Sequence, residues 1–359
     1  MKFNPNYTIT IEIAKFLVQI EEHKDTFRKK PLTAKLLTSL RKSARLISTH
    51  YSTQIEGNRL SMEQVEQVVK RKSGFANRER DEIEVANYYK ALEYIEKIQK
   101  EDFSEKIIKT IHGLVMKGTT KLSPYREGQN VIRDGLSGSI VYMPPEAKDV
   151  NPLMENLVLW INSEIKNGKI PIPIIASLAH YQIATIHPYY DGNGRTARLI
   201  TTFLLHRYGY GLKGIYSLEE YYANNITGYY DALAVDNIPN YYMGRAEADI
   251  TGFISYFMEA MANSFSKINI HANEQSTTIS KVDTSIIRDL DVQQRAVLTL
   301  FVDFRKVSSQ LIADHLGVKK RSATYLIKKW LESGFLEIEN PSFKSRTYKL
   351  NQDLEKHIE

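Results

Sequence analysis

Residues 187–198 of this chain read H-P-Y-Y-D-G-N-G-R-T-A-R. Apolar residues recur at helical spacing before this stretch, in residues 174–186, and after it, in residues 199–207. This pattern predicts a loop between two helices, of which the second is buried. The loop combines a histidine, a carboxylate, two glycines, an amide and two arginines, and this density favours chemistry over a plain connection.

The glycines and arginines of this loop suit a bound polyphosphate. Gly192 and Gly194 allow the backbone to turn its N–H groups inward, and the following helix presents its positive N-terminal end to the same point. Arg195 and Arg198 lie three residues apart on that helix. Both can therefore face an anion and donate to separate phosphates. The loop predicts a triphosphate site.

The acid and the base of the loop complete the expected chemistry. Asp191 has the hard carboxylate oxygen that Mg²⁺ prefers, so we expect it to hold that ion against the phosphates. His187 has an imidazole that titrates near neutral pH, which makes it the candidate general base. A purely structural histidine is the alternative interpretation, and the surrounding residues favour the catalytic one.

A different nucleotide site competes with this interpretation. Residues 192–197 also match the G-x-G-x-x-A form of the dinucleotide fingerprint. That fingerprint needs a preceding strand and a βαβ unit, whereas here a helix is expected before it and no strand–helix alternation surrounds it. A Walker A sequence is absent as well, so neither a Rossmann site nor a P-loop is favoured.

The stretch resembles the signature of the Fic family, H-x-F-x-[D/E]-G-N-G-R-x-x-R, and differs only in having Tyr189 where phenylalanine is usual. The resemblance implies a protein adenylyltransferase, which moves AMP from ATP to a Ser, Thr or Tyr hydroxyl of a target protein or of itself. It also implies Mg²⁺ at Asp191 and His187 as the base. The phosphates would be held by Gly192, Asn193, Gly194, Arg195 and Arg198.

Residues 130–142, N-V-I-R-D-G-L-S-G-S-I-V-Y, predict a β-hairpin, because two β-prone arms flank turn residues that include D-G at 134–135. Two prolines at 144–145 end it, since neither can donate a ladder hydrogen bond. The hairpin resembles the Fic flap, which pairs with the main chain of the target. Y-R at 125–126 also resembles a family neighbour of the flap, and a plain surface hairpin is the alternative.

Two further segments resemble functional parts of Fic proteins. S-T-Q-I-E-G-N, residues 52–58, is similar to the inhibitory motif [S/T]-x-x-x-E-[G/N]. The resemblance implies that Glu56 pairs with Arg198 and competes with the γ-phosphate of ATP, in its own chain or in a neighbouring one. An ordinary exposed glutamate is the alternative. Tyr229 and Tyr230 stand about where the family lines the nucleotide pocket.

The predicted fold class is mainly all-α, with a Fic-type helical core, a small hairpin and a C-terminal winged helix-turn-helix. Nearly every long segment has apolar residues three and four apart. The expected division is an N-terminal helical region with the inhibitory motif at 1–75, the core at 76–263, a polar linker at 264–283 and the winged unit at 284–359.

The winged unit is expected to contain helices at 307–316 and 321–333 and two strands within 335–350. Residues 319–350 hold eight basic side chains against three acidic ones. This balance is typical of a protein that binds the DNA backbone, with residues 319–324 at the start of a recognition helix. Winged helices also serve as dimer or target-docking modules, so both interpretations stay open.

Composition limits the remaining choices. The 359 residues are 42% hydrophobic and 25% charged with a net charge of +6, which is typical of a globular protein. No cysteine is present, which excludes disulfides, thiolate catalysis and cysteine-bound zinc and favours the cytoplasm. No signal peptide or membrane span is expected. A homodimer, a nucleotide-sensing transcription regulator, and a Fic enzyme that removes AMP or uses another donor are further hypotheses.

Overall fold

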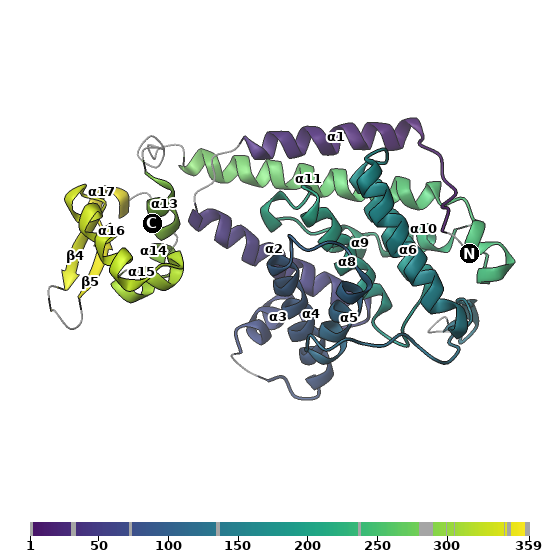
Figure 1. The fold of residues 1–359 in the computed structure, drawn as a ribbon. Coiled ribbons are helices and arrows are strands. Elements are labelled where there is room, and N and C mark those ends of the chain that lie inside the picture. The colour runs from purple at the N-terminus through teal and green to yellow at the C-terminus, as the bar shows by residue number, and fades with distance from the viewer. Residues whose placement is uncertain are drawn as a thin grey trace. The chain divides into compact units, whose positions relative to one another are not determined.

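A computed structural model of the chain describes residues 3–29, 34–71, 74–133, 137–235, 238–279, 290–298, 300–304, 306–340, 342 and 346–355. These residues form mainly helices with two small sheets (Figure 1), so the predicted fold class is confirmed. The chain divides into two compact units. The larger contains Met1–Lys29 and Arg41–Asn269, and the smaller contains Lys30–Leu40 and Ile270–Glu359.

The centre of the larger unit is a pair of helices, α7 and α8, on either side of the 187–198 stretch. The helix α7 spans Ile172–Ile186 and α8 spans Asn193–Arg207. Apolar residues occur all round α7, and a helix of that kind must be covered on every side. Three helices that contact this pair provide the cover: α4 (Glu79–Lys97), α5 (Glu105–Lys117) and α6 (Ala147–Asn167).

The remaining elements of this unit surround that core. The helix α1 runs alongside α11 (Figure 1), and the Asn269 amide donates to the His23 carbonyl at 2.9 Å between them. The elements not yet given are α1 (Ile11–Arg28), α2 (Ala34–Ile55), α3 (Met62–Val69), η1 (Leu212–Gly214), α9 (Glu219–Asn224), α10 (Ile226–Ala234), η2 (Tyr241–Met243), η3 (Arg245–Glu247) and α11 (Thr251–Ile279).

The chain does not divide at the boundary predicted near residue 75. Met1–Lys29 and the residues from Arg41 onward belong to the same compact unit as the core, whereas Lys30–Leu40 belong to the smaller unit. Leu46, Leu60 and Val65 from the N-terminal part share one buried apolar cluster with Val85 of α4. Burial of these side chains against one another joins the two parts, so residues 1–75 do not form a separate region.

The predicted linker at 264–283 is also wrong in its first part, because α11 continues to Ile279. Phe265 is fully buried, and the Ser264 hydroxyl donates to the Ser217 carbonyl at 3.2 Å. The polar side chains that suggested a linker include Asn269, which is hydrogen-bonded to α1. Residues 280–283 of the expected linker lie outside the described residues.

The predicted hairpin is present. Strand β1 (Ile132–Arg133) pairs antiparallel with β2 (Ile140–Tyr142), with an irregularity in the register. The expected D-G turn at 134–135 lies outside the described residues. After β2, the Met143 N–H donates to the Pro239 carbonyl at 2.7 Å, so the end of the hairpin is tied to the loop before η2.

The smaller unit contains two consecutive helices and a three-stranded sheet. Gly317, at φ 65°, turns the chain between α15 and α16, and the strands pair antiparallel in the order β3-β5-β4. Its buried cluster includes Val297, Ile312 and Trp330. The elements are α13 (Val292–Leu298), α14 (Leu300–Asp303), β3 (Val307–Ser308), α15 (Ser309–Leu316), α16 (Lys320–Glu332), β4 (Leu336–Asn340), β5 (Thr347–Leu350) and α17 (Gln352–Glu355).

One predicted boundary in this unit needs correction. A helix was expected from residue 307, but Val307 and Ser308 form β3, and the helix begins at Ser309. Val307 is buried and pairs with Tyr348, while the Ser308 hydroxyl accepts from the Leu311 N–H at 3.2 Å as an N-cap. The assignment of the whole unit as a winged helix-turn-helix stays a prediction.

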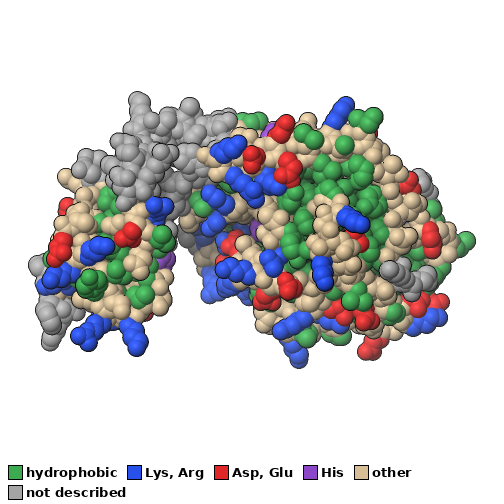
Figure 2. Space-filling view, turned by 45° about the horizontal axis from the view of Figure 1, so that its top comes forward, with side chains coloured by type: hydrophobic (Ala, Val, Ile, Leu, Met, Phe, Trp, Pro, Cys, Tyr) green, Lys and Arg blue, Asp and Glu red, His purple; other side chains and the backbone are tan. Residues whose placement is uncertain are grey.

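Charged side chains of both signs are spread over the surface. On the face shown in Figure 2, basic and acidic side chains are interspersed over the described residues. Within the described residues, no helix is both long and apolar enough to cross a membrane.

Candidate active site

The 187–198 stretch forms the predicted loop between two helices. The helix α7 ends at His187, whose backbone is left-handed (φ 51°, ψ 59°), and α8 begins after Gly192, which is left-handed at φ 76°. This left-handed φ favours glycine, and a Cβ on Gly192 would also lie 2.7 Å from the Met116 Sδ and displace that side chain. The two turns bring His187 close to the positive N-terminal end of α8.

Tyr189, the one departure from the signature, is accommodated by stacking. Its side chain is 2% exposed, and its ring lies parallel to the His112 ring with centroids 3.4 Å apart. The His112 Nε2 lies 2.9 Å from the carbonyl oxygen of Asp191. Burial lowers the pKa of His112 to about 4, so this ring is neutral near pH 7 and packs as an aromatic plate.

His187 is partly buried, and its protonation state follows from that environment. Its pKa is lowered to about 4, mainly by burial and to a lesser degree by the Arg126 guanidinium, while a backbone hydrogen bond with Ala184 and the charges of Glu56 and Asp191 oppose the shift. The imidazole is therefore neutral at physiological pH and free to accept a proton.

Asn193 was expected to hold phosphate oxygens, but its side chain is hydrogen-bonded to the backbone of Tyr189. Its Oδ1 accepts from the Tyr189 N–H at 2.9 Å, and its Nδ2 donates to the Tyr189 carbonyl at 2.8 Å. With both amide atoms engaged and the residue 2% exposed, the side chain closes the loop. Any contact of Asn193 with a phosphate would come from its backbone N–H at the start of α8.

Arg195 lies between two carboxylates. Its guanidinium is 3.1 Å from the Asp191 Oδ1 and 3.6 Å from the Glu84 Oε1, and its side chain is 3% exposed. Asp191 is half exposed and also accepts from the Gly192 N–H. Among the described residues, no group of three or more His, Cys, Asp or Glu could hold a metal ion. Asp191 alone fits Mg²⁺ only together with substrate phosphates.

Arg198 meets the predicted inhibitory residue. An oxygen of Glu56 lies 2.8 Å from its guanidinium, whose side chain is 1% exposed. The same guanidinium donates to the hydroxyl and the carbonyl of Ser52, at 2.8 and 2.9 Å. Burial alone would lower the pKa of Arg198, but the Glu56 carboxylate and nearby phenols outweigh it and hold that pKa above its ordinary value.

Gly194 explains how closely Glu56 approaches α8. A Cβ at Gly194 would lie 2.4 Å from the Glu56 Oε1, so the carboxylate rests against the backbone of the first helical turn. The N-terminal end of a helix attracts anions. Glu56 therefore occupies the position that the sequence predicts for phosphate.

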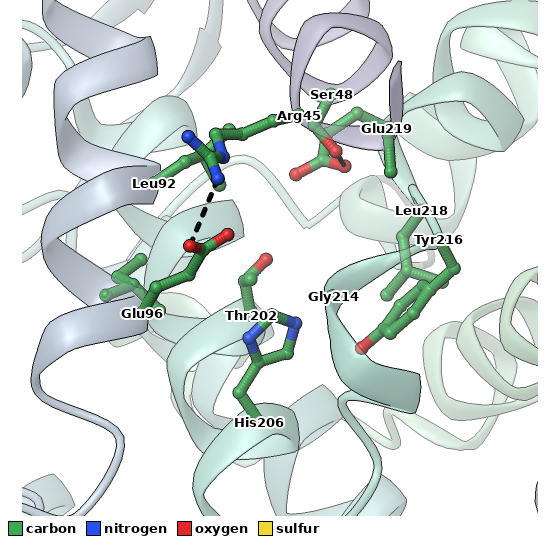
Figure 3. Close-up of a pocket in the computed structure, with 12 residues that line it drawn as sticks. Arg45, Ser48, Leu92, Glu96, Thr202, His206, Gly214, Tyr216, Leu218 and Glu219 are labelled. Carbon is green, nitrogen blue, oxygen red and sulfur yellow. Dashed lines mark hydrogen bonds and ion pairs between the residues drawn. The ribbon is translucent and has the colours of Figure 1, made fainter. Parts of the chain in front are cut away.

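The helix α2, which ends at Ile55 just before Glu56, is held to the core by polar contacts (Figure 3). Arg45 pairs with Glu96 at 3.1 Å, and the Ser48 hydroxyl donates to the Glu219 carboxylate at 2.9 Å. Glu219 is 2% exposed and also accepts from the Tyr88 hydroxyl at 3.1 Å. Arg45, Ser48, Glu96 and Glu219 are among the residues that line a pocket with a volume of about 20 Å³, which is room for about one water molecule.

The two predicted tyrosines of the nucleotide pocket lie at different depths. Tyr229 is 2% exposed, and its hydroxyl is 2.9 Å from the His180 Nε2 in the core. Tyr230 is 49% exposed, and its hydroxyl donates to the Ile55 carbonyl at 3.4 Å, next to Glu56. Of these two tyrosines, Tyr230 is the one whose side chain is exposed.

Two carboxylates of the site were not predicted. Glu84 pairs with Arg195, and Glu219 holds Ser48, yet both lie in ordinary helical sequence with no local signal. Arg126 was predicted only as a neighbour of the flap, although it contacts the loop directly, with its Nε 2.9 Å from the His187 carbonyl. Only the tertiary fold brings these side chains to the site.

Known proteins are similar to the part of the chain that holds this loop. Residues 102–205 match the model of the Fic/DOC family. The protein adenylyltransferase Fic of Drosophila grimshawi is 31% identical over 197 residues, 54% of this chain and 40% of that protein. Its Drosophila melanogaster counterpart is 31% identical over 177 residues, 48% of this chain and 35% of that protein. Residues 102–205 are therefore similar to the Fic/DOC family, and the chain spans less than half the length of these curated relatives.

Two solved structures of Fic proteins are also similar to this chain. A Fic family protein from Desulfovibrio desulfuricans G20 aligns with a TM-score of 0.62 and 25% identity, over 98% of this chain and 99% of that chain. Residues 134–508 of Fic-1 from C. elegans align with a TM-score of 0.59 and 23% identity, over 74% of this chain and 73% of that chain. The second likeness concerns the fold alone.

Proposed function

We propose that this protein is a protein adenylyltransferase that moves AMP from ATP to a hydroxyl side chain of a target protein or of itself. The observation that carries the proposal is the juxtaposition of a neutral His187 with an anion site at the start of α8, where Glu56 now lies against Arg198. The Fic domain and its adenylyltransferase relatives support the same reaction.

The reaction follows from the arrangement of the loop. With Glu56 displaced, the β- and γ-phosphates of ATP take its place at the first turn of α8, where Arg195 and Arg198 neutralise their charge. His187 accepts the proton of the target hydroxyl as its oxygen attacks the α-phosphorus. The bond from that phosphorus to the β-phosphate oxygen breaks, and pyrophosphate leaves. Asp191 would hold Mg²⁺, whose charge assists departure of the pyrophosphate.

The flap provides the place for the target. Ile140 and Val141 of β2 are 43% and 48% exposed on a hairpin of this unit. An extended segment can add to a strand edge through main-chain hydrogen bonds, with side-chain contacts setting preference. The proposed target therefore presents its hydroxyl on an extended segment.

Mass spectrometry tests the proposed reaction. The Glu56→Gly variant, incubated with Mg-ATP and a cell extract, is expected to add adenylyl groups to protein hydroxyls. Phosphoryl or other nucleotidyl adducts would instead favour another donor. Loss of adenylyl groups from premodified protein would favour AMP removal, and ATP binding without any adduct would favour a nucleotide-sensing regulator.

The pH dependence of the reaction reports on His187. Burial lowers its pKa to about 4, and the base must be unprotonated. We expect protonation of His187 to leave kcat/KM of the Glu56→Gly variant unchanged from neutral pH down to about pH 5. As the pH drops through about 4, His187 becomes protonated and kcat/KM should fall. Circular dichroism over the same range checks that the protein stays folded. A fall in kcat/KM near the ordinary histidine pKa of about 6.5, with the protein still folded, would contradict the lowered pKa of His187.

A second function, DNA binding, is favoured by the exposed face of α16. Lys320, Arg321 and Lys328 are exposed there, and Tyr325 is 72% exposed among them. We propose that this face contacts the phosphate backbone of duplex DNA.

Salt titration tests this second function. Lysine and arginine contacts to phosphates release counterions, at about 0.9 in the log–log salt slope for each contact. Lys320→Ala with Arg321→Ala is expected to reduce the slope by about 2 and to weaken binding to all sequences. Lys349→Ala is the matched control, because its ammonium already pairs with Glu337 and Glu339. Equal slopes for both variants, or no binding by the intact protein, would remove this role.

A further inference from the structure

A single buried arginine connects three separate segments around His187. Arg126 is 2% exposed, and its Nε donates to the His187 carbonyl at 2.9 Å. One terminal nitrogen donates to the Gly128 carbonyl at 3.1 Å, and the other donates to the carbonyl of Pro145. Every nitrogen of its side chain is therefore satisfied by a backbone carbonyl, which gives a buried charge its hydrogen-bond partners.

The first of these contacts fixes an uncommon backbone conformation. His187 has φ 51°, a left-handed value that residues other than glycine rarely adopt. This conformation turns its carbonyl toward Arg126, which also donates its backbone N–H to the Pro188 carbonyl at 2.9 Å. The orientation of the His187 side chain follows from that of its backbone, so Arg126 acts on the candidate base without touching its ring.

Neighbouring residues extend this connection into a seam between residues 126–130 and 187–190. The Gly128 N–H donates to the Tyr190 hydroxyl at 2.7 Å, and the Asn130 amide donates to the Tyr189 carbonyl at 3.2 Å. A Cβ at Gly128 would lie 2.8 Å from the Tyr190 hydroxyl, so a larger residue there would displace the Tyr190 side chain. The seam is built from specific contacts along its whole length.

The other two acceptors of Arg126 bracket the flap. Gly128 precedes β1, and Pro145 follows β2. The guanidinium that binds the His187 carbonyl therefore also binds one carbonyl before the hairpin and one after it. Because guanidinium is a rigid planar fork, the three carbonyls are fixed relative to one another, which a lysine ammonium on a flexible stem cannot reproduce.

We propose that Arg126 is a positioning residue that sets the orientation of His187 and holds the flap in register with it. A target segment paired with the flap then has its hydroxyl at a fixed distance from the base. This inference rests on the proposed adenylyl transfer for its effect on rate, whereas its structural part concerns the flap and the loop alone. Small misplacements of reacting groups can reduce a rate by about a hundredfold.

The test compares Arg126→Lys with Arg245→Lys, both in the Glu56→Gly background. Arg245 is 7% exposed and donates to the carbonyls of Leu233, Val235 and Ile238. Its guanidinium also lies over the Tyr142 ring of β2, 5.2 Å from the centroid, so this variant controls for a buried arginine that touches the flap without holding the His187 carbonyl. We expect Arg126→Lys to lower kcat by roughly 10- to 100-fold while KM for ATP stays within about twofold, because Arg126 touches none of the residues of the anion site. Arg245→Lys is expected to retain kcat at a similar cost in Tm.

Hydrogen exchange and a gentler variant keep the result interpretable. Arg126→Lys should speed amide exchange in both 132–142 and 187–191, and exposed Tyr190→Phe should change kcat and exchange in the same direction by a few-fold. Loss of kcat no larger than in Arg245→Lys, with exchange unchanged in both segments, would overturn the proposal. If the parent variant transfers no AMP, the proposed function fails, and exchange alone decides whether Arg126 couples flap and loop.

Discussion

The Glu56→Gly variant is expected to transfer AMP roughly 10- to 100-fold faster than the intact protein. Glu56 pairs with Arg198 at 2.8 Å and rests on the backbone of Gly194, where the γ-phosphate would bind. A hydrogen bond to a charged group contributes about 1.5–3 kcal/mol, and about 1.4 kcal/mol corresponds to tenfold in an equilibrium. Removal of this competitor should therefore raise the population of productively bound ATP by that factor.

Initial rates at matched ATP concentrations measure this effect. Glu63→Gly is a suitable control, because Glu63 lies in the next helix, α3, and its carboxylate is bound by Ser61 rather than by the site. Equal rates for the intact protein and the Glu56→Gly variant would remove the inhibitory role. A dilution series distinguishes inhibition within one chain, which is independent of concentration, from inhibition by a neighbouring copy.

The second large effect is expected for His187→Ala in the Glu56→Gly background. Loss of a positioned general base reduces a rate by about 10²- to 10⁴-fold. The nucleotide should still bind, because its phosphates contact the start of α8 and the arginines rather than the imidazole. ATP affinity within about twofold, together with loss of transfer, would separate the base from a binding residue.

A matched histidine controls for structural damage. His112 is also buried beside the loop, and its ring stacks on Tyr189 rather than facing the anion site. His112→Phe should preserve that stack but removes the hydrogen bond between Nε2 and the Asp191 carbonyl, so we expect a smaller loss of activity than for His187→Ala. Transfer that survives His187→Ala at the parental rate would show that another group accepts the proton.

The local pattern predicted the loop well, and the reasons are physical. Glycines at 192 and 194 are required by a left-handed turn and by the close approach of Glu56, so their spacing carries structural information. The contact between Glu56 and Arg198 joins residues far apart in the chain, and only the family resemblance anticipated it. Composition and periodicity alone would have left these two side chains unrelated.

Other features depend on tertiary contacts that no local pattern encodes. The polar residues of α11 resembled a linker, yet Ser264 and Asn269 donate to carbonyls of distant segments, which compensates their burial. Glu219 and Glu84 are ordinary helix residues until the fold brings Ser48 and Arg195 to them. The role of Arg126 can be inferred only from the folded structure, which brings the carbonyls of Gly128, Pro145 and His187 to its guanidinium.

The most direct test of adenylyl transfer is to supply the Glu56→Gly variant with ATP labelled at either the α- or the γ-phosphate. In the proposed reaction the α-phosphorus joins the target hydroxyl and the β- and γ-phosphates leave together. We expect protein to acquire the α-label and none of the γ-label, and we expect the α-label to disappear with His187→Ala. Protein that acquires the γ-label instead would mean phosphoryl transfer rather than adenylyl transfer.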